Sequence, residues 1–269
     1  MKQLRMAVAV SLGVFALSAG ASAESLRVGT ECTYAPFNYR TADGDLTGYD
    51  VDVAMEVGKR IGADIEFVCQ EWDGMIPALL ANKFDLIVAS MSITEKRLKQ
   101  IDFSGPYRVS IGQFVGRKDG GLALFNDDGS VNPGGFEGVR VGLERSSTYE
   151  EWMKAKVPGA EVVYYDGNEP MYLDLNAGRV DVIMTNPMKA YLKFLSEDGN
   201  KDFDVIGPQI DEVEYFGIGV GIGLRQGQDE LKGRINEALE AMTGDGALNE
   251  FSLRYFPFPI YPQEWRGAS

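Results

Sequence analysis

Two stretches of the sequence repeat the same alternation of short β-rich runs and helix-patterned segments. In the first, Leu26–Thr30 and Ile65–Val68 are β-rich. Between them, 49–61 carries apolar residues at 51, 54, 55 and 61, close to the helical period. A strand, a helix and a second strand predict a parallel sheet, because parallel neighbours need a crossover. A similar block begins at 139–143, so the sequence predicts an α/β protein with two similar lobes.

The remaining elements of both blocks follow from the same patterns. A Ser or Thr followed by Glu, as in Ser92–Arg97, favours a helix start. The segment 116–135 is rich in Gly, Asp and Asn, which favours a loop. We expect helices over about 74–81, 149–156 and 170–177, and strands over 85–88, 161–165 and 181–184.

One short pattern occurs in both blocks. In 80–90 and in 175–186 a helix ends, an Asp opens a strand, and a small polar residue follows five positions later. These polar residues are Ser90 and Asn186. Ligands of open α/β sheets bind beyond the carboxyl ends of strands, so both residues are expected to face a ligand between the lobes. A chance likeness is the alternative, because helix-turn-strand patterns are common.

The first 23 residues predict an export signal. Lys2 and Arg5 precede an apolar stretch, Met6–Leu17, and small residues up to Ala23 precede Glu24. This pattern is typical of a signal peptide cleaved after Ala23, and the apolar stretch is too short to span a membrane. A short buried helix is the alternative. We therefore expect a periplasmic, soluble mature chain of about 245 residues, which suits two lobes.

Charge and composition exclude several classes of function. Removing Lys2 and Arg5 from 26 basic residues leaves 24 against 40 acidic residues, a net charge of −16. A surface that acidic repels nucleic acid and anionic lipid. The chain has 0 His, which excludes a Ser-His-Asp triad, an HExxH zinc site and imidazole acid–base catalysis. We expect no cofactor, no metal and no nucleic-acid partner.

Cys32 and Cys69 are the two cysteines of the chain. Both lie at or just past the ends of predicted strands that a βαβ unit places side by side, and disulfides persist in an oxidising compartment. We expect a disulfide between them; two free buried thiols are the alternative.

Several motifs in a fixed order resemble a known family. They are Thr33–Phe37, Gly48–Asp52, Ser90–Arg97 and Phe216–Arg225, followed by an aromatic tail near Tyr255 and Phe256. Together they resemble the bacterial periplasmic binding proteins for polar amino acids, close to the lysine/arginine/ornithine and histidine receptors. The likeness covers essentially the whole mature chain. It implies a type II periplasmic binding protein: two lobes, each a parallel-rich sheet flanked by helices, joined by two hinge crossings.

The resemblance also implies a division of the chain and a mode of action. Lobe one would comprise residues 24–112 and 216–269, and lobe two residues 113–215, with crossings near 108–112 and 214–216. A small amino-acid-like ligand would bind between the lobes and close them like a jaw. The closed protein, expected to be a monomer, would then dock on a membrane-embedded ABC permease.

Arg97 is the first candidate for ligand binding. Its planar guanidinium can hold a carboxylate through two parallel hydrogen bonds, which a lysine cannot do. Ser90 and Ser92 would add hydroxyl and backbone donors from the same turn, and Ala89 only its backbone. A surface arginine on a helix is the alternative.

Other candidates come from positions that match the family. Tyr34 and Trp72 would hold the aliphatic stem of the ligand and attract a cation over their ring faces; for Tyr34 the alternative is core packing. Glu31 would bind the cationic end of a basic ligand. Thr148 and Tyr149 would add contacts from lobe two.

Glu144 and Asn186 leave the nature of the ligand open. The family usually has an aspartate where this chain has Asn186, and that aspartate accepts the α-ammonium group of the ligand. An Asn oxygen can still accept a hydrogen bond but stabilises an ammonium less. Either Glu144 substitutes, or the ligand nitrogen is modified, as in the opines, whose receptors resemble this pattern of Glu, Trp, Arg and Asn. Alternatively, Glu144 pairs with Arg145 or faces water.

A count of charges separates these readings. Arg97 and Glu31 alone make a neutral site, which suits a net-neutral zwitterion such as an opine. With Glu144 inside, the site carries one negative charge and suits arginine, lysine or ornithine. We expect a basic amino acid receptor rather than an enzyme. The alternatives are an opine receptor, a periplasmic dehydratase that uses Glu31 or Glu144 as general acid, and a sensory receptor domain.

Overall fold

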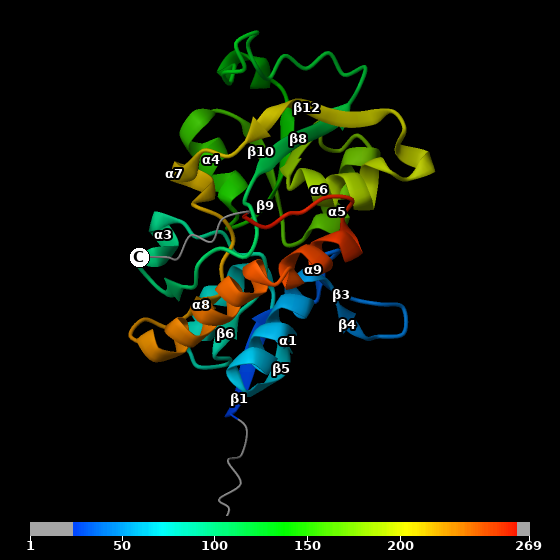
Figure 1. Ribbon diagram of the computed structural model, residues 1–269. Coiled ribbons are helices and arrows are strands. Elements are labelled where there is room, and N and C mark those ends of the chain that lie inside the picture. Colours follow the sequence, from blue (N-terminus) through cyan, green and yellow to red (C-terminus); the bar gives the residue numbers. More distant parts are fainter. Residues whose placement is uncertain (1–23, 263–269) are drawn as a thin grey trace, which may run out of the picture.

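The structure, a computed structural model, describes residues 24–262 (Figure 1). The predicted signal peptide, residues 1–23, lies outside the described residues, as does the end of the chain from 263. Across 24–262, no helix combines the length and the apolar character needed to cross a membrane.

One five-stranded sheet is built from both ends of the described chain. Its order is β5-β1-β6-β13-β7, with β1 parallel to β5 and β6, and β13 antiparallel to β6 and β7. Side chains on its two faces join two different hydrophobic clusters, because neighbouring residues of a strand point to opposite faces. The strands are β1 (Glu24–Thr30), β5 (Ala63–Cys69), β6 (Leu86–Ile87), β7 (Asp102–Phe103) and β13 (Gly223–Leu224).

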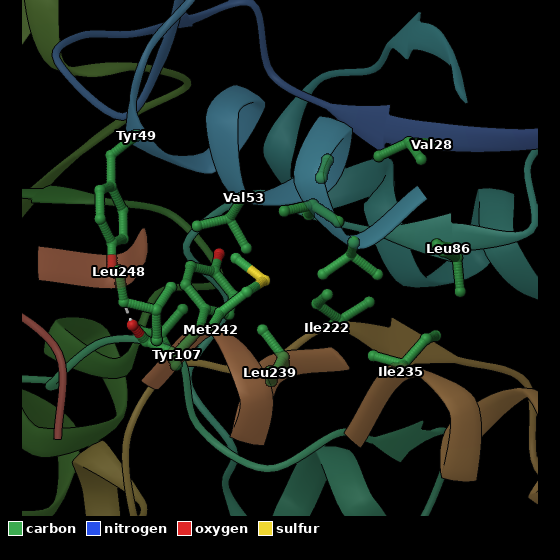
Figure 2. Packing of buried hydrophobic residues seen from close by; sticks show 14 of the residues in the cluster. Val28, Tyr49, Val53, Leu86, Tyr107, Ile222, Ile235, Leu239, Met242 and Leu248 are labelled. Carbon is green, nitrogen blue, oxygen red and sulfur yellow. Dashed lines mark hydrogen bonds between the residues drawn. The ribbon is translucent and has the colours of Figure 1, made fainter. Parts of the chain in front are cut away.

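Helices from distant parts of the sequence cover this sheet. On one face, apolar side chains of three long helices pack on Val28, Leu86 and Ile222 (Figure 2). The hydroxyl of Tyr49 donates to the carbonyl of Tyr107 at 2.9 Å within this cluster. The helices on this face are α1 (Tyr49–Ile61), α8 (Asp229–Gly244) and α9 (Ala247–Tyr255). The other face is covered by α2 (Met75–Leu80), which follows the 3-10 turn Trp72–Gly74. Helix α3 (Glu95–Leu98) comes next in the sequence.

The second five-stranded sheet lies in the middle of the sequence. Its order is β10-β9-β11-β8-β12, with β9 parallel to β10 and β11, and β8 antiparallel to β11 and β12. The elements are β8 (Gly112–Arg117), the 3-10 turn Pro133–Phe136, β9 (Arg140–Glu144), α4 (Thr148–Lys156), β10 (Glu161–Tyr165), α5 (Asn168–Asn176), β11 (Val182–Thr185), α6 (Pro187–Ala190), the π turn Tyr191–Leu195, the 3-10 turn Asp198–Asn200, β12 (Phe203–Ile210) and α7 (Val213–Phe216). A small three-stranded sheet, β2 (Thr33–Tyr34), β3 (Asn38–Arg40) and β4 (Leu46–Thr47), flanks the first sheet.

The same ion pair marks equivalent places in the two sheets. Asp85 accepts hydrogen bonds from the backbone N–H and the guanidinium of Arg27, and Asp181 does the same for Arg140. These are the two aspartates of the repeated sequence pattern, and each precedes a strand, β6 or β11. The predicted repeat is therefore present in the fold, and it brings the chain to equivalent positions at the carboxyl ends of both strands.

The predicted α/β class is confirmed, with small differences at element ends. Helix α1 has the predicted bounds, whereas β6 spans only Leu86–Ile87 of the strand predicted over 85–88. The N–H groups of Asp85 and Val88 still donate to the carbonyls of Arg27 and Gly29, so hydrogen bonds to the first strand continue on both sides of β6. The loop predicted over 116–135 holds the turn Pro133–Phe136 at its end.

The disulfide is also confirmed. Cys69 ends β5 and Cys32 lies two residues after β1, so the parallel pairing of these strands brings their Cα atoms to 5.6 Å. The bond ties the segment that follows β1 to the first sheet, next to Glu31.

The chain passes between the two large sheets twice, between Phe103 and Gly112 and between Ile210 and Gly223. The sheets nevertheless share contacts away from these passages: Met188, next to β11, packs in the cluster of the first sheet. The carboxyl ends of β1, β6, β9 and β11 consequently meet around one space.

Candidate functional site

A cavity lies where these strand ends meet, and all eleven candidate residues line it. Each half of the fold contributes: Glu31 follows β1 and Ser90 follows β6, while Glu144 ends β9 and Asn186 follows β11. The lining comprises the predicted Glu31, Tyr34, Trp72, Ala89, Ser90, Ser92, Arg97, Glu144, Thr148, Tyr149 and Asn186, together with Arg108, Ser110, Ile111 and Ser147.

Arg97 is a buried cation on α3. The hydroxyl of Thr94 caps this helix by accepting the Arg97 N–H, and the side chain is only 9% exposed. The guanidinium donates to the carbonyls of Ser92 at 3.0 Å and Ser146 at 3.4 Å, and it lies 5.2 Å from the Trp72 ring centroid. Within the described chain it forms no ion pair. Burial lowers the pKa of Arg97 to about 10, so the group remains charged at neutral pH.

Two carboxylates from opposite sheets line the same cavity. Glu144 is 5% exposed, and its Oε1 accepts from Asn168 Nδ2 at 3.2 Å. It does not pair with Arg145, which pairs with Asp166 instead. Burial, and then the negative charge of Glu144, raise the pKa of Glu31 well above its ordinary value. Burial likewise raises the pKa of Glu144. Burial therefore disfavours the ionised form of both carboxyls unless a positive charge lies nearby.

Lys189 is a cation that the sequence analysis missed. It lies on α6, is 2% exposed, and places Nζ 3.5 Å from the centroid of the Tyr34 ring. Burial lowers the pKa of Lys189 to about 8, although the charges of Glu144 and Glu31 raise it. Its neighbours in sequence gave no sign of burial, because a lysine in a short helix usually faces water. With Lys189 counted, the expected charge of −1 for a site that contains Glu144 is corrected to zero.

The serines after β6 are engaged within the protein. The hydroxyl of Ser90 donates to Asp50 Oδ2 at 2.8 Å, and its N–H donates to the Tyr107 hydroxyl at 3.2 Å. The Ser92 hydroxyl shares a 2.7 Å hydrogen bond with that of Ser110. The donors that we expected Ser90 to offer a ligand are therefore already used, which leaves it acceptor oxygens.

Asn186 presents the opposite chemistry to the one expected. Its Oδ1 caps α6 by accepting the N–H groups of Met188 at 3.0 Å and Lys189 at 3.1 Å. The oxygen that we expected to accept the ligand nitrogen is thus occupied. Its Nδ2 has no hydrogen-bond partner among residues 24–262, so the position offers the cavity a donor.

Three of the four lining residues that were not predicted come from the first passage between the sheets, and the fourth, Ser147, caps α4. Arg108 is 3% exposed, with its guanidinium carbon 4.3 Å from the Phe37 ring centroid and the buried charge of Asp50 nearby. Ser110 and Ile111 follow it. The sequence predicts this segment only as a crossing, although a passage between two lobes must also run along the space between them.

Among the described residues, no cluster of three or more His, Cys, Asp or Glu is suited to a metal.

Comparisons with known proteins place the chain among solute-binding proteins. Residues 26–258 match the bacterial extracellular solute-binding proteins, family 3. The L-arginine-binding protein of Pseudomonas aeruginosa is 35% identical, over 97% of this chain and 99% of its own length. The lysine/arginine/ornithine-binding periplasmic protein of Escherichia coli is 34% identical, over 96% and 97%. An arginine-specific periplasmic binding protein of Salmonella typhimurium superposes with a TM-score of 0.77 at 30% identity, covering 87% of this chain and all of that one.

Proposed function

The chain belongs to family 3 of the bacterial extracellular solute-binding proteins, with the type II periplasmic binding protein fold, and we propose that it captures an amino acid with a cationic side chain for an ABC importer. Relatives named for binding L-arginine, histidine, or lysine, arginine and ornithine support this ligand class, although another relative is named for binding L-cystine. In this proposal the signal at 1–23 directs the protein to the periplasm. There the closed monomer docks on a membrane-embedded permease.

The arrangement of charges in the cavity carries the proposal. Among residues 24–262, Arg97 is buried without an ion pair, and neither Glu31 nor Glu144 pairs with it. An enclosed cation without an anion is costly, so the cavity favours a ligand that brings a carboxylate. Lys189 can balance one of the two carboxylates, and the cationic side chain of the ligand supplies a positive charge for the other. An amino acid with a basic end satisfies both places.

Ligand capture would proceed by closure. Lobe one, residues 24–112 and 216–269, holds Arg97, Glu31, Tyr34 and Trp72. Lobe two, residues 113–215, adds contacts from its side of the cavity only when the lobes meet. Contacts that exist only in the closed state shift the population toward it. The lobe-two contacts are Glu144, Thr148, Tyr149 and Asn186.

Calorimetric titration with L-arginine tests the proposal. Replacing Arg97 by Ala leaves the ligand carboxylate unpaired in a closed cavity, which should cost about 2–5 kcal/mol, a loss of roughly thirtyfold or more in affinity. Lys83→Ala, which removes an exposed cation, is the matched control and should bind like the wild type. Equal affinities of the Arg97→Ala variant and the wild type would refute the carboxylate site.

The occupied oxygen of Asn186 favours a second candidate ligand. An α-ammonium group facing this residue would meet an amide N–H₂ group rather than an acceptor. An amino acid whose α-nitrogen carries an oxygen-bearing substituent, as in an opine, would instead give Asn186 an acceptor. Separate calorimetric titrations of the protein with arginine and with an Nα-carboxyalkyl arginine decide between the two ligands. Tighter binding of arginine would reject the opine-like ligand.

Binding rather than catalysis is part of the proposal, because the relatives are named as binding proteins. Bound ligand should be recovered unchanged by chromatography after long incubation with the protein. A product formed in proportion to protein and time would reveal an enzyme, with Glu31 or Glu144 as the first candidate acid.

A further inference from the structure

Lys189 combines three features that general packing does not explain. Its side chain is among the fully buried ones, at 2% exposure. Its Nζ has no hydrogen-bond partner among residues 24–262. Nevertheless its ammonium sits 3.5 Å from the centre of the Tyr34 ring, a residue of the cavity wall. Burying an ammonium without hydrogen bonds is unfavourable, so a purely structural role would be better served by an apolar residue.

The surroundings of Lys189 indicate what the charge acts on. Glu144 and Glu31 are the two acids that act most strongly on it, and both line the cavity. The ring of Tyr34 adds a cation–π contact from the first sheet, while α6 belongs to the second. Lys189 therefore lies between the halves of the protein, at the end of the site where the carboxylates bind the ligand cation.

We propose that Lys189 is a specificity-determining residue that balances one of the two cavity carboxylates and thereby sets the net charge of the ligand that the site accepts. This inference rests on the proposed function. With Lys189 present, the formal charges of Glu31, Glu144, Arg97 and Lys189 sum to zero, while the charge of Arg108 is offset by that of Asp50. The site then prefers ligands with a net positive charge less strongly than the same site would without this lysine.

Removing Lys189 should change selectivity, not only affinity. The same site without this lysine carries a net charge of −1, which suits arginine at +1. Citrulline has nearly the same shape as arginine but a neutral side-chain end. The ratio of their affinities consequently reports the charge of the site, whereas a change in packing alone would weaken both ligands alike.

The experiment is a calorimetric titration of the wild type and of Lys189→Met with arginine and with citrulline. Methionine keeps the length of the side chain and removes its charge. We expect the preference for arginine over citrulline to rise at least about tenfold in Lys189→Met. Lys83→Met makes the same change of net charge at an exposed position and should leave the ratio unaltered. Lys189→Arg, which keeps the charge, should restore a ratio close to the wild type.

The outcomes separate the two proposals. If both proteins bind both ligands and the ratio in Lys189→Met stays within about twofold of the wild type, Lys189 does not set selectivity and this inference is wrong. If neither protein binds either ligand, the proposed function fails, and the inference with it. Thermal unfolding of Lys189→Met serves as the folding control: a single cooperative transition shows that the variant folds, with a midpoint below that of the wild type because the buried carboxylates lose their balancing charge.

Discussion

At the scale of single residues, the buried ionisable groups of the cavity make the stability of the fold depend on pH. The pKa of Glu31 is raised by burial and by Glu144, and that of Glu144 is raised by burial. A carboxyl whose pKa is raised by folding stabilises the fold fully below its ordinary pKa of about 4.5, and this contribution is lost as the pH rises through the raised value. The closed, ligand-free protein should therefore lose stability from this pair as the pH rises above about 4.5.

Glu31→Gln tests this directly. Glutamine keeps the shape and cannot ionise, so the variant should match the wild type near pH 4 and become more stable than it toward pH 8. Each kcal/mol corresponds to about 2–4 °C in the thermal midpoint of a chain of this size. Glu66→Gln, a substitution in strand β5, is the control. A difference between the Glu31→Gln variant and the wild type that does not change with pH would show that Glu31 is not destabilised in its charged form.

Asn186→Asp addresses the group that faces the ligand nitrogen. An aspartate caps α6 with one carboxylate oxygen and leaves the other as an acceptor, while adding a negative charge. We expect tenfold or greater strengthening of free arginine binding, measured by calorimetry. Unchanged arginine binding would place the α-nitrogen of the ligand away from residue 186.

The site residues found from the sequence differ from Lys189, which was missed, in how their positions are determined. Arg97, Glu31 and Asn186 were found because each follows directly from a motif or a strand end. The burial of Lys189 depends on Tyr34, which approaches from the other half of the fold, so no local pattern can indicate it. The direction of the Asn186 amide was also hidden, since it depends on the N–H groups of α6.

At the scale of elements, α3 and α4 lie beside the cavity, to which each contributes lining residues. Lys96 on α3 and Glu151 on α4 form an ion pair at 2.6 Å, but their side chains are 67% and 39% exposed. Solvent screens such a pair, which typically contributes about 0–1 kcal/mol. This ion pair therefore contributes less to the stability of the closed state than the buried charges do.

Replacing Lys96 by Ala should accordingly reduce ligand affinity by less than about fivefold. The loss should lie mainly in a faster dissociation rate, because the pair forms only when the two helices meet. Stopped-flow measurements with increasing salt give the check: the wild type should approach the variant as salt screens the pair. A loss of affinity as large as that of Arg97→Ala would mean that closure depends mainly on this exposed ion pair.

The elements themselves were largely predictable, because most are amphipathic and have clear ends. Helix α1 spans Tyr49–Ile61 as expected, since its apolar positions repeat and Gly62 ends it in the left-handed conformation (φ 74°). Strand pairing was less accessible: β13 enters the first sheet from near the end of the chain, and no short-range pattern specifies that partner.

At the scale of the whole molecule, the two sheets bring oppositely charged groups to one enclosed space. Arg97 provides a place for an anion, while Glu31 and Glu144 provide a place for a cation. The central claim is that one ligand joins these places, so both of its charged ends contribute to closure.

The most direct test compares L-arginine with agmatine, which has the same guanidinium end and lacks the carboxylate. Calorimetric titration of the wild type should show saturable binding of arginine and binding of agmatine weaker by roughly thirtyfold or more. Equal affinities for the two compounds would contradict a ligand carboxylate on Arg97.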